Sequence, residues 1–361
     1  MKKSIFVLLS ILIIVSMTLT ACGAKAAPAK GTITLWHAWK DTEITALNKV
    51  IAAFQAQNPD TKFNVLYVPF DDLRGKFETA SASGGGPSVL IGGADWGPAL
   101  YGAGLVADLT GKVDTKNVNT AALGAVQYKN ALIGMPETIK GVVMYRNKTI
   151  VPKAAKTFDE LVANAKAATK GDVQGAMLEY GFFFSAAHLN AVGGTLMDAD
   201  GNPKFNDAKG VAWVQLIQSF KNAGQVTNNT DDDVNLFKAG KAGIIIDGTW
   251  NMTALADAIG KDNLVIDPWP SSLSGYVQTE NIYMSANATG DDQNAAIAFI
   301  NFFMSKDAQT LMSEAGHIPA ISGVTVTDPL LQQAITAFKG GAVFPVIPEM
   351  GAYWDPMNNM L

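Results

Sequence analysis

The chain has 361 residues and a formal net charge of −5, from 27 Lys and Arg against 32 Asp and Glu. This balance provides no basic surface for nucleic acid, so we expect no nucleic-acid partner. The roughly 330 residues that follow the N-terminal region exceed what one hydrophobic core usually supports, which predicts two lobes.

The first residues have the form of a bacterial lipoprotein signal. Lys2 and Lys3 precede an apolar run over 4–19 that is short for a bilayer-spanning helix. The run ends in Leu-Thr-Ala-Cys-Gly, which resembles a lipobox, and the thiolate of the single cysteine, Cys22, can take the lipid. We therefore expect a signal peptide over 1–21, lipid attachment at Cys22 and a tether over 22–30. No later run is long and apolar enough to cross a membrane.

The next part alternates strands and helices. Strands are expected over 32–39, 62–68 and 87–93, with helices over 41–60 and 73–86. The first helix places Ile44, Leu47, Val50, Ile51 and Phe54 on one stripe. This β-α-β-α-β order favours a parallel sheet covered by helices.

The middle and later parts continue the alternation. Helices are expected over 158–169, 207–224 and 291–316, the last range holding two, and buried strands over 241–248 and 263–270. A Gly-Asn-Pro turn within 191–207 predicts a hairpin. In the helix over 207–224, the expected inward residues are Val211, Val214, Ile217 and Phe220, with Trp213 also in the core.

Several motifs suggest chemistry but have simpler explanations. The Gly-rich run over 81–88 lacks the Lys-Ser/Thr of a phosphate loop. The sequence over 198–202 has Pro203 where a calcium loop needs glycine, so a hairpin turn is favoured. The acidic run over 231–233 is typical of a helix start. The histidines His37, His188 and His317 lack metal-ligand spacing, so we expect no metal.

Tryptophans at strand ends are more informative. Trp39, Trp96 and Trp250 each stand at or just after the end of a predicted strand, and ligands of open α/β sheets bind at the carboxyl ends of strands. Such aromatic faces beside carboxylates and amides suit a sugar, because rings cover its C–H face while polar groups bind its hydroxyls.

Four longer segments resemble one family. They are GGGPSVLIGGADWGPALYGAGLVADL, YKNALIGMPETIKGVVMYRNKTIV, FKAGKAGIIIDGTWNM and GGAVFPVIPEMGAYWDPM. Together they resemble the extracellular solute-binding proteins of carbohydrate ABC importers, the family of the maltose-binding protein, over nearly everything after the tether.

The resemblance implies an α/β, two-lobed periplasmic-binding-protein fold of type II, in which each lobe is a mainly parallel sheet covered by helices. It implies an N-terminal lobe over 31–139 and 281–325 and a C-terminal lobe over 140–280 and 326–361, with a short C-terminal helical region. Hinge crossovers are expected at 138–141 and 276–281.

The resemblance also implies ligand-binding positions. Asp95, Trp250 and Trp354 match sugar contacts, and Phe183 matches an aromatic binding position. Trp96 adjoins them, Lys40 and Asp41 stand beside a Lys/Asp pair in reversed order, and Trp39 and Glu280 are inferred from position. Lys140 replaces a glutamate of the maltose-binding protein's cleft.

The function implied is that of the substrate-binding component of an ABC sugar importer, with a malto-oligosaccharide-like ligand as the main expectation. We expect no enzymatic activity and no cofactor. The expected partners are the carbohydrate, the permease and, through the lipid, the outer face of the cell membrane; the expected state is a monomer. Two alternatives stay open: a lipid-anchored glycoside hydrolase, whose carboxyl pair would come together only in space, and a binding protein for a non-sugar solute.

Overall fold

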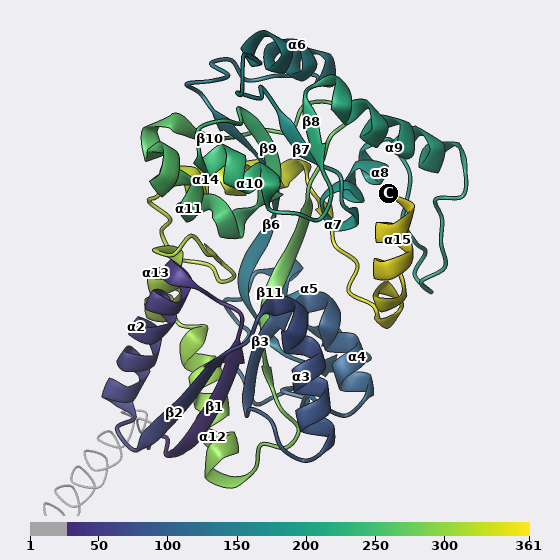
Figure 1. Ribbon diagram of the computed structural model, residues 1–361. Helices are drawn as coiled ribbons and strands as arrows, with labels where there is room; N and C mark the ends of the chain where they lie inside the picture. The colour runs from purple at the N-terminus through teal and green to yellow at the C-terminus, as the bar shows by residue number, and fades with distance from the viewer. Residues whose placement is uncertain (1–26) are drawn as a thin grey trace, which may run out of the picture.

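The structure is a computed structural model that describes residues 27–361. The expected signal peptide and Cys22 lie outside the described residues. Two α/β lobes stand one above the other, joined by the long strands β6 and β11 (Figure 1). Within residues 27–361 no helix combines the length and the apolar character that a membrane crossing needs.

The lower lobe in Figure 1 begins with a parallel three-stranded arrangement. Strand β1 pairs in parallel with both β2 and β3, so the expected β-α-β-α-β order is confirmed. The strands and helices of this lobe are β1 (Gly31–His37), α2 (Asp41–Gln57), β2 (Thr61–Tyr67), α3 (Phe70–Ala82), β3 (Val89–Gly93), α4 (Gly97–Gly102), α5 (Thr120–Gly124), β4 (Gln127–Tyr128), β5 (Ala131–Leu132), α12 (Gly290–Phe303) and α13 (Lys306–Ser313).

The upper lobe has the same layered construction. Strand β7 pairs in parallel with β8 and with β9, while β10 runs antiparallel to β6. Its elements are α6 (Phe158–Ala168), β7 (Met177–Glu179), α7 (Phe182–Ser185), α8 (Ala187–Ala191), α9 (Ala208–Ser219), β8 (Gln225–Thr227), α10 (Asp232–Lys238), β9 (Ile244–Gly248), α11 (Met252–Ile259), β10 (Leu264–Asp267), α14 (Pro329–Ala337), β13 (Ala342–Val343) and α15 (Trp354–Met360).

The two lobes share the strands that cross between them. Strand β6 (Met135–Asn147) pairs with β11 (Tyr276–Met284) as far as Gly141 and with β9 from Val142 onward. The sheet order is therefore β2-β1-β3-β11-β6-β9-β7-β8, with β6 and β11 antiparallel in the middle. A third connection runs through β12 (Ile318–Pro319), which pairs with β6 before the chain enters α14.

Glycine is required where the crossing strands meet. A Cβ atom on Gly141 would lie 2.1 Å from the backbone oxygen of Tyr276. Any larger residue would push the two strands apart at the place where β6 leaves one lobe for the other, which explains the glycine in the middle of this strand.

Each lobe has its own hydrophobic core. In the lower lobe Leu47, Val50 and Phe54 of α2 pack against β1 and against Phe299 of α12. The predicted stripe of α2 is largely confirmed, since Leu47, Val50, Ile51 and Phe54 are buried and Ile44 is half-buried. The upper lobe has separate clusters on the two faces of its sheet.

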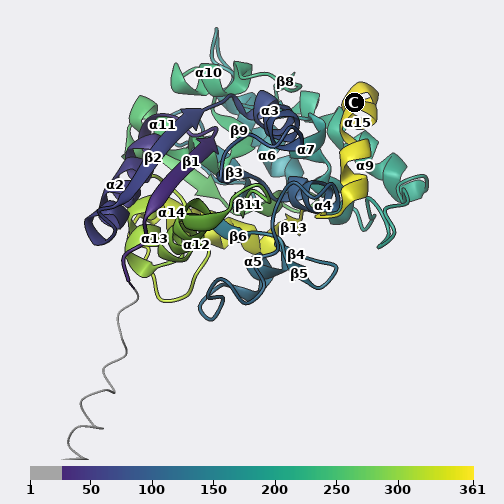
Figure 2. The ribbon, with the colours of Figure 1, turned by 90° about the horizontal axis from the view of Figure 1, so that it is seen from below.

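Helix α9 corrects one expectation. Trp213 is fully buried as predicted, but Val211 is 58% exposed. The buried stripe of α9 consists of Gly210, Trp213 and Ile217, because the wide indole sets which side of the helix faces the core. The C-terminal helix α15 lies beside α9 in both ribbon views and packs into the same cluster (Figures 1 and 2).

The hairpin expected within 191–207 is only partly formed. One antiparallel bridge joins Met197 to Pro203, and the backbone N–H of Asp198 donates to Asn202 across the turn. No strand is assigned in this stretch, so it is a turn closed by isolated bonds.

Candidate functional site

An aromatic wall of the upper lobe faces the space between the lobes. Trp250 lies in the 3-10 helix Thr249–Asn251 directly after β9, and its side chain is 38% exposed. Phe183 of α7 lies 6.1 Å from Trp250, ring centre to ring centre, and also 6.1 Å from Trp354 at the start of α15, with the latter rings nearly parallel at 28°. These three rings come from distant parts of the sequence and together form one apolar surface.

The turn after β9 positions Trp250. A Cβ atom on Gly248 would lie 2.1 Å from the indole of Trp250, so only glycine lets the ring fold back over the strand end. The carboxylate of Asp247 accepts from the backbone N–H of Gly248 and from the side-chain amide of Asn251, 3.1 Å away. The Asp-Gly-Thr-Trp sequence therefore builds its own rigid turn.

The lower lobe opposes this wall at the end of β3. Asp95 and Trp96 lie in the 3-10 helix Ala94–Trp96, which contacts the 3-10 helix Pro348–Ala352 of the upper lobe. Burial raises the pKa of Asp95, and Arg74, the indole of Trp354 and Lys140 offset only part of that rise. Trp96 is buried, and its ring lies 4.9 Å from that of Phe70.

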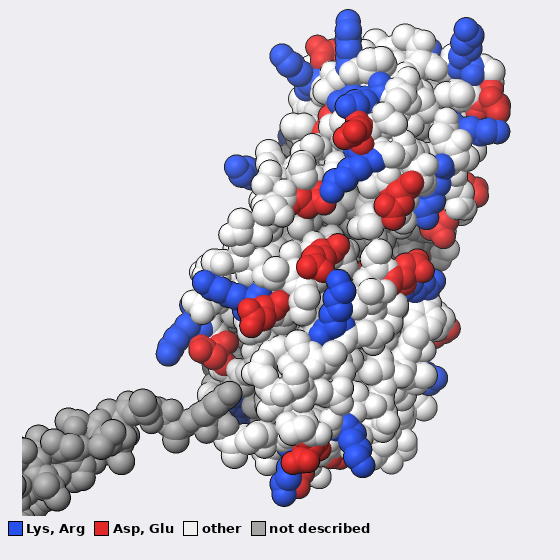
Figure 3. Space-filling model, turned by 90° about the vertical axis from the view of Figure 1, so that its left-hand side faces the viewer, with Lys and Arg blue, Asp and Glu red and all other residues white. Residues whose placement is uncertain are grey.

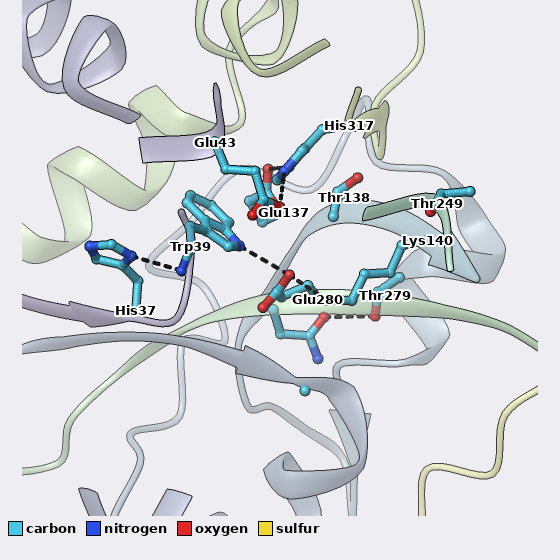
Figure 4. Close-up of polar contacts among 12 residues, drawn as sticks. His37, Trp39, Glu43, Glu137, Thr138, Lys140, Thr249, Thr279, Glu280 and His317 are labelled. Atoms are coloured by element: carbon cyan, nitrogen blue, oxygen red, sulfur yellow. Dashed lines mark hydrogen bonds and ion pairs between the residues drawn. The ribbon is translucent and has the colours of Figure 1, made fainter. Parts of the chain in front are cut away.

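The floor of the space holds an ion pair on the crossing strands. Nζ of Lys140 lies 2.6 Å from Oε2 of Glu280, and the indole N–H of Trp39 donates to the same oxygen at 3.1 Å (Figure 4). Burial alone would raise the pKa of Glu280, but Lys140 and Trp39 outweigh burial and hold that pKa below its usual value. Glu280 is therefore a charged acceptor at neutral pH.

A second charged group adjoins the first. Nδ1 of His317 lies 2.8 Å from Glu137, and its Nε2 lies 3.0 Å from Glu43 at the start of α2 (Figure 4). Burial lowers the pKa of His317, but the two carboxylates outweigh burial and raise that pKa to about 10. The imidazole is therefore protonated at neutral pH, and its ring also stands edge-on to Trp39, 5.0 Å between centres.

These groups line one hollow between the lobes. Its walls combine carboxylates, cations, hydroxyls and one indole, and they are Glu43, Thr138, Ile139, Lys140, Thr249, Trp250, Glu280, Ala315, Gly316 and His317. The chemistry of these walls suits a polar ligand with both hydrogen-bond donors and acceptors and an apolar face.

The expected ligand-binding residues have different placements. Trp250 and Glu280 line the hollow, and Phe183 and Trp354 extend the wall of Trp250. Asp95 and Trp96 lie opposite, with Trp96 buried against Phe70.

The remaining expected residues lie farther from the hollow. Trp39 is only 3% exposed and lies behind Glu280. Lys40 and Asp41 are exposed at the start of α2, where Nζ of Lys40 stands 5.6 Å from the ring centre of Tyr67. Their side chains are not among those that line the hollow.

Sequence reasoning missed several lining residues. The sequence identifies Lys140 only as a departure from the family, and it gives no indication that Glu43 or His317 lines a site. The signal for Glu43 is its place in the first helical turn after Trp39, and the signal for His317 is the preceding Gly316 at the end of a helix. Neither signal identifies a partner. Within the described chain no cluster of three or more His, Cys, Asp or Glu is arranged to hold a metal ion.

Comparison with known proteins identifies the family. The profile of the bacterial extracellular solute-binding proteins matches residues 49–338. The maltotriose-binding protein of Pyrococcus abyssi is 25% identical over 93% of this chain and 78% of its own length. The galactooligosaccharide-binding protein of Bacillus subtilis is 25% identical over 100% of this chain and 91% of its own.

Solved structures share the fold. The maltose/maltodextrin-binding domain of Bdellovibrio bacteriovorus, solved with maltotriose, has a TM-score of 0.82 at 22% identity and covers 91% of this chain and 92% of its own. The GacH receptor of Streptomyces glaucescens, studied unliganded and with acarbose, has a TM-score of 0.82 at 20% identity over the same shares. The chain belongs to the family of bacterial extracellular solute-binding proteins.

Proposed function

We propose that the protein binds a mono- or oligosaccharide between its lobes, with a malto-oligosaccharide-like sugar as the first candidate, and delivers it to the permease of an ABC importer. The observation that carries the proposal is the wall of Trp250, Phe183 and Trp354 facing the charged floor. Relatives that bind maltotriose and galactooligosaccharides support it.

The chemistry of the lining matches what a sugar needs. A pyranose has an apolar C–H face that an indole can cover and a rim of hydroxyls that both donate and accept. The floor supplies an acceptor in Glu280, a donor in Lys140 and a hydroxyl in Thr138, and Thr249 beside Trp250 supplies a second hydroxyl. No bond-breaking step is required of any of these groups for binding.

Delivery requires that the lobes move. We propose that they correspond to 31–139 with 281–325 and to 140–280 with 326–361, and that β6 and β11 bend where they cross. A ligand that contacts both walls interacts better with the closed form than with the open one, and this difference shifts the population toward closure.

The lipoprotein signal at the N-terminus concerns where the protein is held in the cell. We propose that Cys22 carries a lipid that holds a monomer at the outer face of the membrane, close to its permease. The surface that carries α2 and α13 supports a protein that works in solution, because acidic and basic side chains are interspersed on it (Figure 3).

A thermal-shift screen tests the proposal. The panel contains glucose, maltose, maltotriose, galactobiose and, as a non-sugar, spermidine. A ligand that prefers the native form raises the unfolding midpoint in proportion to the logarithm of its concentration, and we expect this for at least one oligosaccharide. The proposal fails if no sugar raises the midpoint. Chromatography of the sugar after incubation separates binding from hydrolysis, since a binding protein returns it intact.

Trp250 is expected to contribute directly. Trp250→Ala removes the exposed ring of the wall, and we expect the binding free energy to weaken by roughly 1–3 kcal/mol in calorimetry. Trp36→Ala is the matched control, because Trp36 is half-buried in the lower lobe and is not part of the hollow. Equal affinities of Trp250→Ala and the unaltered protein would remove Trp250 from the site.

A further inference from the structure

The proposed function does not say which part of the sugar the ammonium group of Lys140 recognises. Lys140 of β6 stands opposite Gln278 of β11, and Thr138 stands opposite Glu280. Residues two apart on a strand share one face, so Thr138, Lys140 and Glu280 project from the same side of the paired strands. Each of the three also lines the hollow, which identifies that face as its floor.

The ammonium lies between the rings of the two lobes. Nζ of Lys140 stands 5.5 Å from the ring centre of Trp250 in the upper lobe and 5.8 Å from that of Phe70 in the lower lobe. A sugar ring that covers the indole of Trp250 has its hydroxyls at the rim of that indole. Because the ammonium stands over this indole, a sugar stacked on the part of the ring that stays free has its hydroxyls near the ammonium.

The pair still has unused hydrogen-bonding capacity. An ammonium has three donors, and in residues 27–361 the only acceptor bonded to Nζ is Oε2 of Glu280. That oxygen takes both Lys140 and Trp39, whereas Oε1 of Glu280 accepts no bond from the described part of the chain and is not sealed in the interior. Donors and an acceptor thus stand side by side on one floor.

We propose that Lys140 and Glu280 act as a paired donor and acceptor that binds two neighbouring hydroxyl groups of the sugar ring stacked on Trp250, which makes Lys140 a specificity-determining residue for a neutral sugar. This inference rests on the proposed function. The ion pair holds both side chains in place before the ligand arrives. The sugar hydroxyls then bind the remaining N–H donors of Lys140 and Oε1 of Glu280. A sugar without one of those hydroxyls leaves an N–H of Lys140 or Oε1 of Glu280 without a hydrogen-bond partner in a closed cleft and is rejected.

The experiment combines protein variants with ligand variants. Calorimetry measures maltotriose and galactobiose, and monodeoxy derivatives of each, against the unaltered protein, Lys140→Met and the double variant Lys140→Met/Glu280→Gln. Lys76→Met is the matched control, because Nζ of Lys76 also stands over an indole, 5.4 Å from the centre of Trp36, but on the exposed surface of α3.

We expect Lys140→Met to weaken binding of the fully hydroxylated sugar on the order of 10- to 100-fold, the usual range for a hydrogen bond to a charged group. We expect Lys76→Met to change it less than about 2-fold. The decisive quantity is the ratio of affinities for the complete and the deoxy sugar. This ratio should collapse toward unity in Lys140→Met for one of the deoxy positions, which a purely structural role of Lys140 would not cause.

The double variant protects against a folding artefact. Lys140→Met alone leaves the charge of Glu280 uncompensated, whereas the double variant keeps the shape and removes both charges. If it folds and still distinguishes the deoxy sugar as the unaltered protein does, the inference is overturned. It is also overturned if Lys140→Met binds the complete sugar equally or more tightly, since the ammonium would then cover the indole against the sugar. A failure of the unaltered protein to bind any sugar contradicts the proposed function itself and is seen before any variant is made.

Discussion

The carboxyl groups of the cleft floor differ in their partners from three buried carboxyl groups of the upper lobe, although a fourth, Asp267, is paired with Arg146. On the floor, Glu280 is paired with Lys140, and Glu137 and Glu43 share the imidazolium of His317. In the upper lobe, Glu179, Asp233 and Asp247 have no ion pair with a basic residue in the described part of the chain; the backbone N–H groups of Gly181, Val234 and Gly248 donate to them instead.

This difference changes their charge. Burial, together with the neighbouring acids, raises the pKa of Asp233 to about 8 and contributes to a pKa of about 7 for Asp247. The pKa of Glu280 is instead lowered, since Lys140 outweighs burial. Glu280 therefore remains an ionised acceptor that a ligand can use, whereas Asp233 and Asp247 hold their protons near neutral pH and bond to the backbone. Asp247 does so in the turn that presents Trp250.

The largest expected loss of stability comes from removing His317, the cation that Glu137 and Glu43 share. His317→Gln leaves Glu137 buried without its cation, and we expect a loss of roughly 3–5 kcal/mol in the free energy of unfolding at about pH 6. Because the pKa of His317 is raised from 6.5 to about 10 in the folded state, its contribution is complete below about pH 6.5 and is lost as the pH rises through about 10. The difference between the variant and the unaltered protein should therefore shrink toward pH 10.

Urea unfolding at several pH values measures this difference, and His188→Gln is the control. Burial lowers the pKa of His188 to about 3, so this buried histidine is neutral throughout the range. Its replacement should cost slightly less at about pH 6, where only the unfolded chain binds a proton at His188, than at about pH 10, which is the opposite trend to that of His317→Gln. A pH-independent loss for His317→Gln would mean that the charge of His317 does not contribute to its interaction with Glu137 and Glu43.

The next largest change in stability is expected at Asp233, which has no ion pair in the described part of the chain. The folded-state pKa of Asp233 is raised from 3.8 to about 8, so the native protein binds more protons than the unfolded chain across that window, and stability falls as the pH rises through it. Asp233→Asn imitates the protonated form and should stabilise the protein by roughly 1–3 kcal/mol at about pH 8.5, with little gain at about pH 4.

Asp232→Asn supplies the comparison for this variant. Asp232 occupies the same helical turn of α10 but is exposed, whereas Asp233 is 2% exposed and has one carboxylate oxygen without a partner. Thermal unfolding across the pH series should separate the two variants. If Asp233→Asn destabilised the protein above neutral pH, the buried Asp233 carboxylate would have favourable interactions that offset the cost of its burial.

The smallest effect comes from an exposed pair of the same charge types. Nζ of Lys49 on α2 lies 2.8 Å from Oε2 of Glu314, and both side chains are about half exposed, at 53% and 55%. Glu314→Gln should change the free energy of unfolding by less than about 1 kcal/mol, and added salt should reduce the change further. A change as large as that of His317→Gln would contradict the view that the His317 interactions contribute more to stability because they are buried.

How much the sequence predicts depends on how local the signal is. The alternation of strands and helices, and the placement of Trp250 after β9, follow from short patterns that the backbone must obey. Lys140 and His317 could not be assigned in the same way, because their partners Glu280 and Glu137 stand 140 and 180 residues away and are brought near only by the crossing strands. The exposure of Val211 shows the same limit on a small scale, since the phase of α9 follows from Trp213 and its neighbours in space.

A crystal structure of the protein grown with the sugar selected by the thermal-shift panel is the most direct measurement. We predict a sugar ring against the indole of Trp250, with hydroxyl groups within hydrogen-bond distance of Lys140 and Glu280 and with both lobes in contact with it. Density for the sugar elsewhere on the molecule, with the hollow above β6 and β11 filled only by water, would contradict the proposed site.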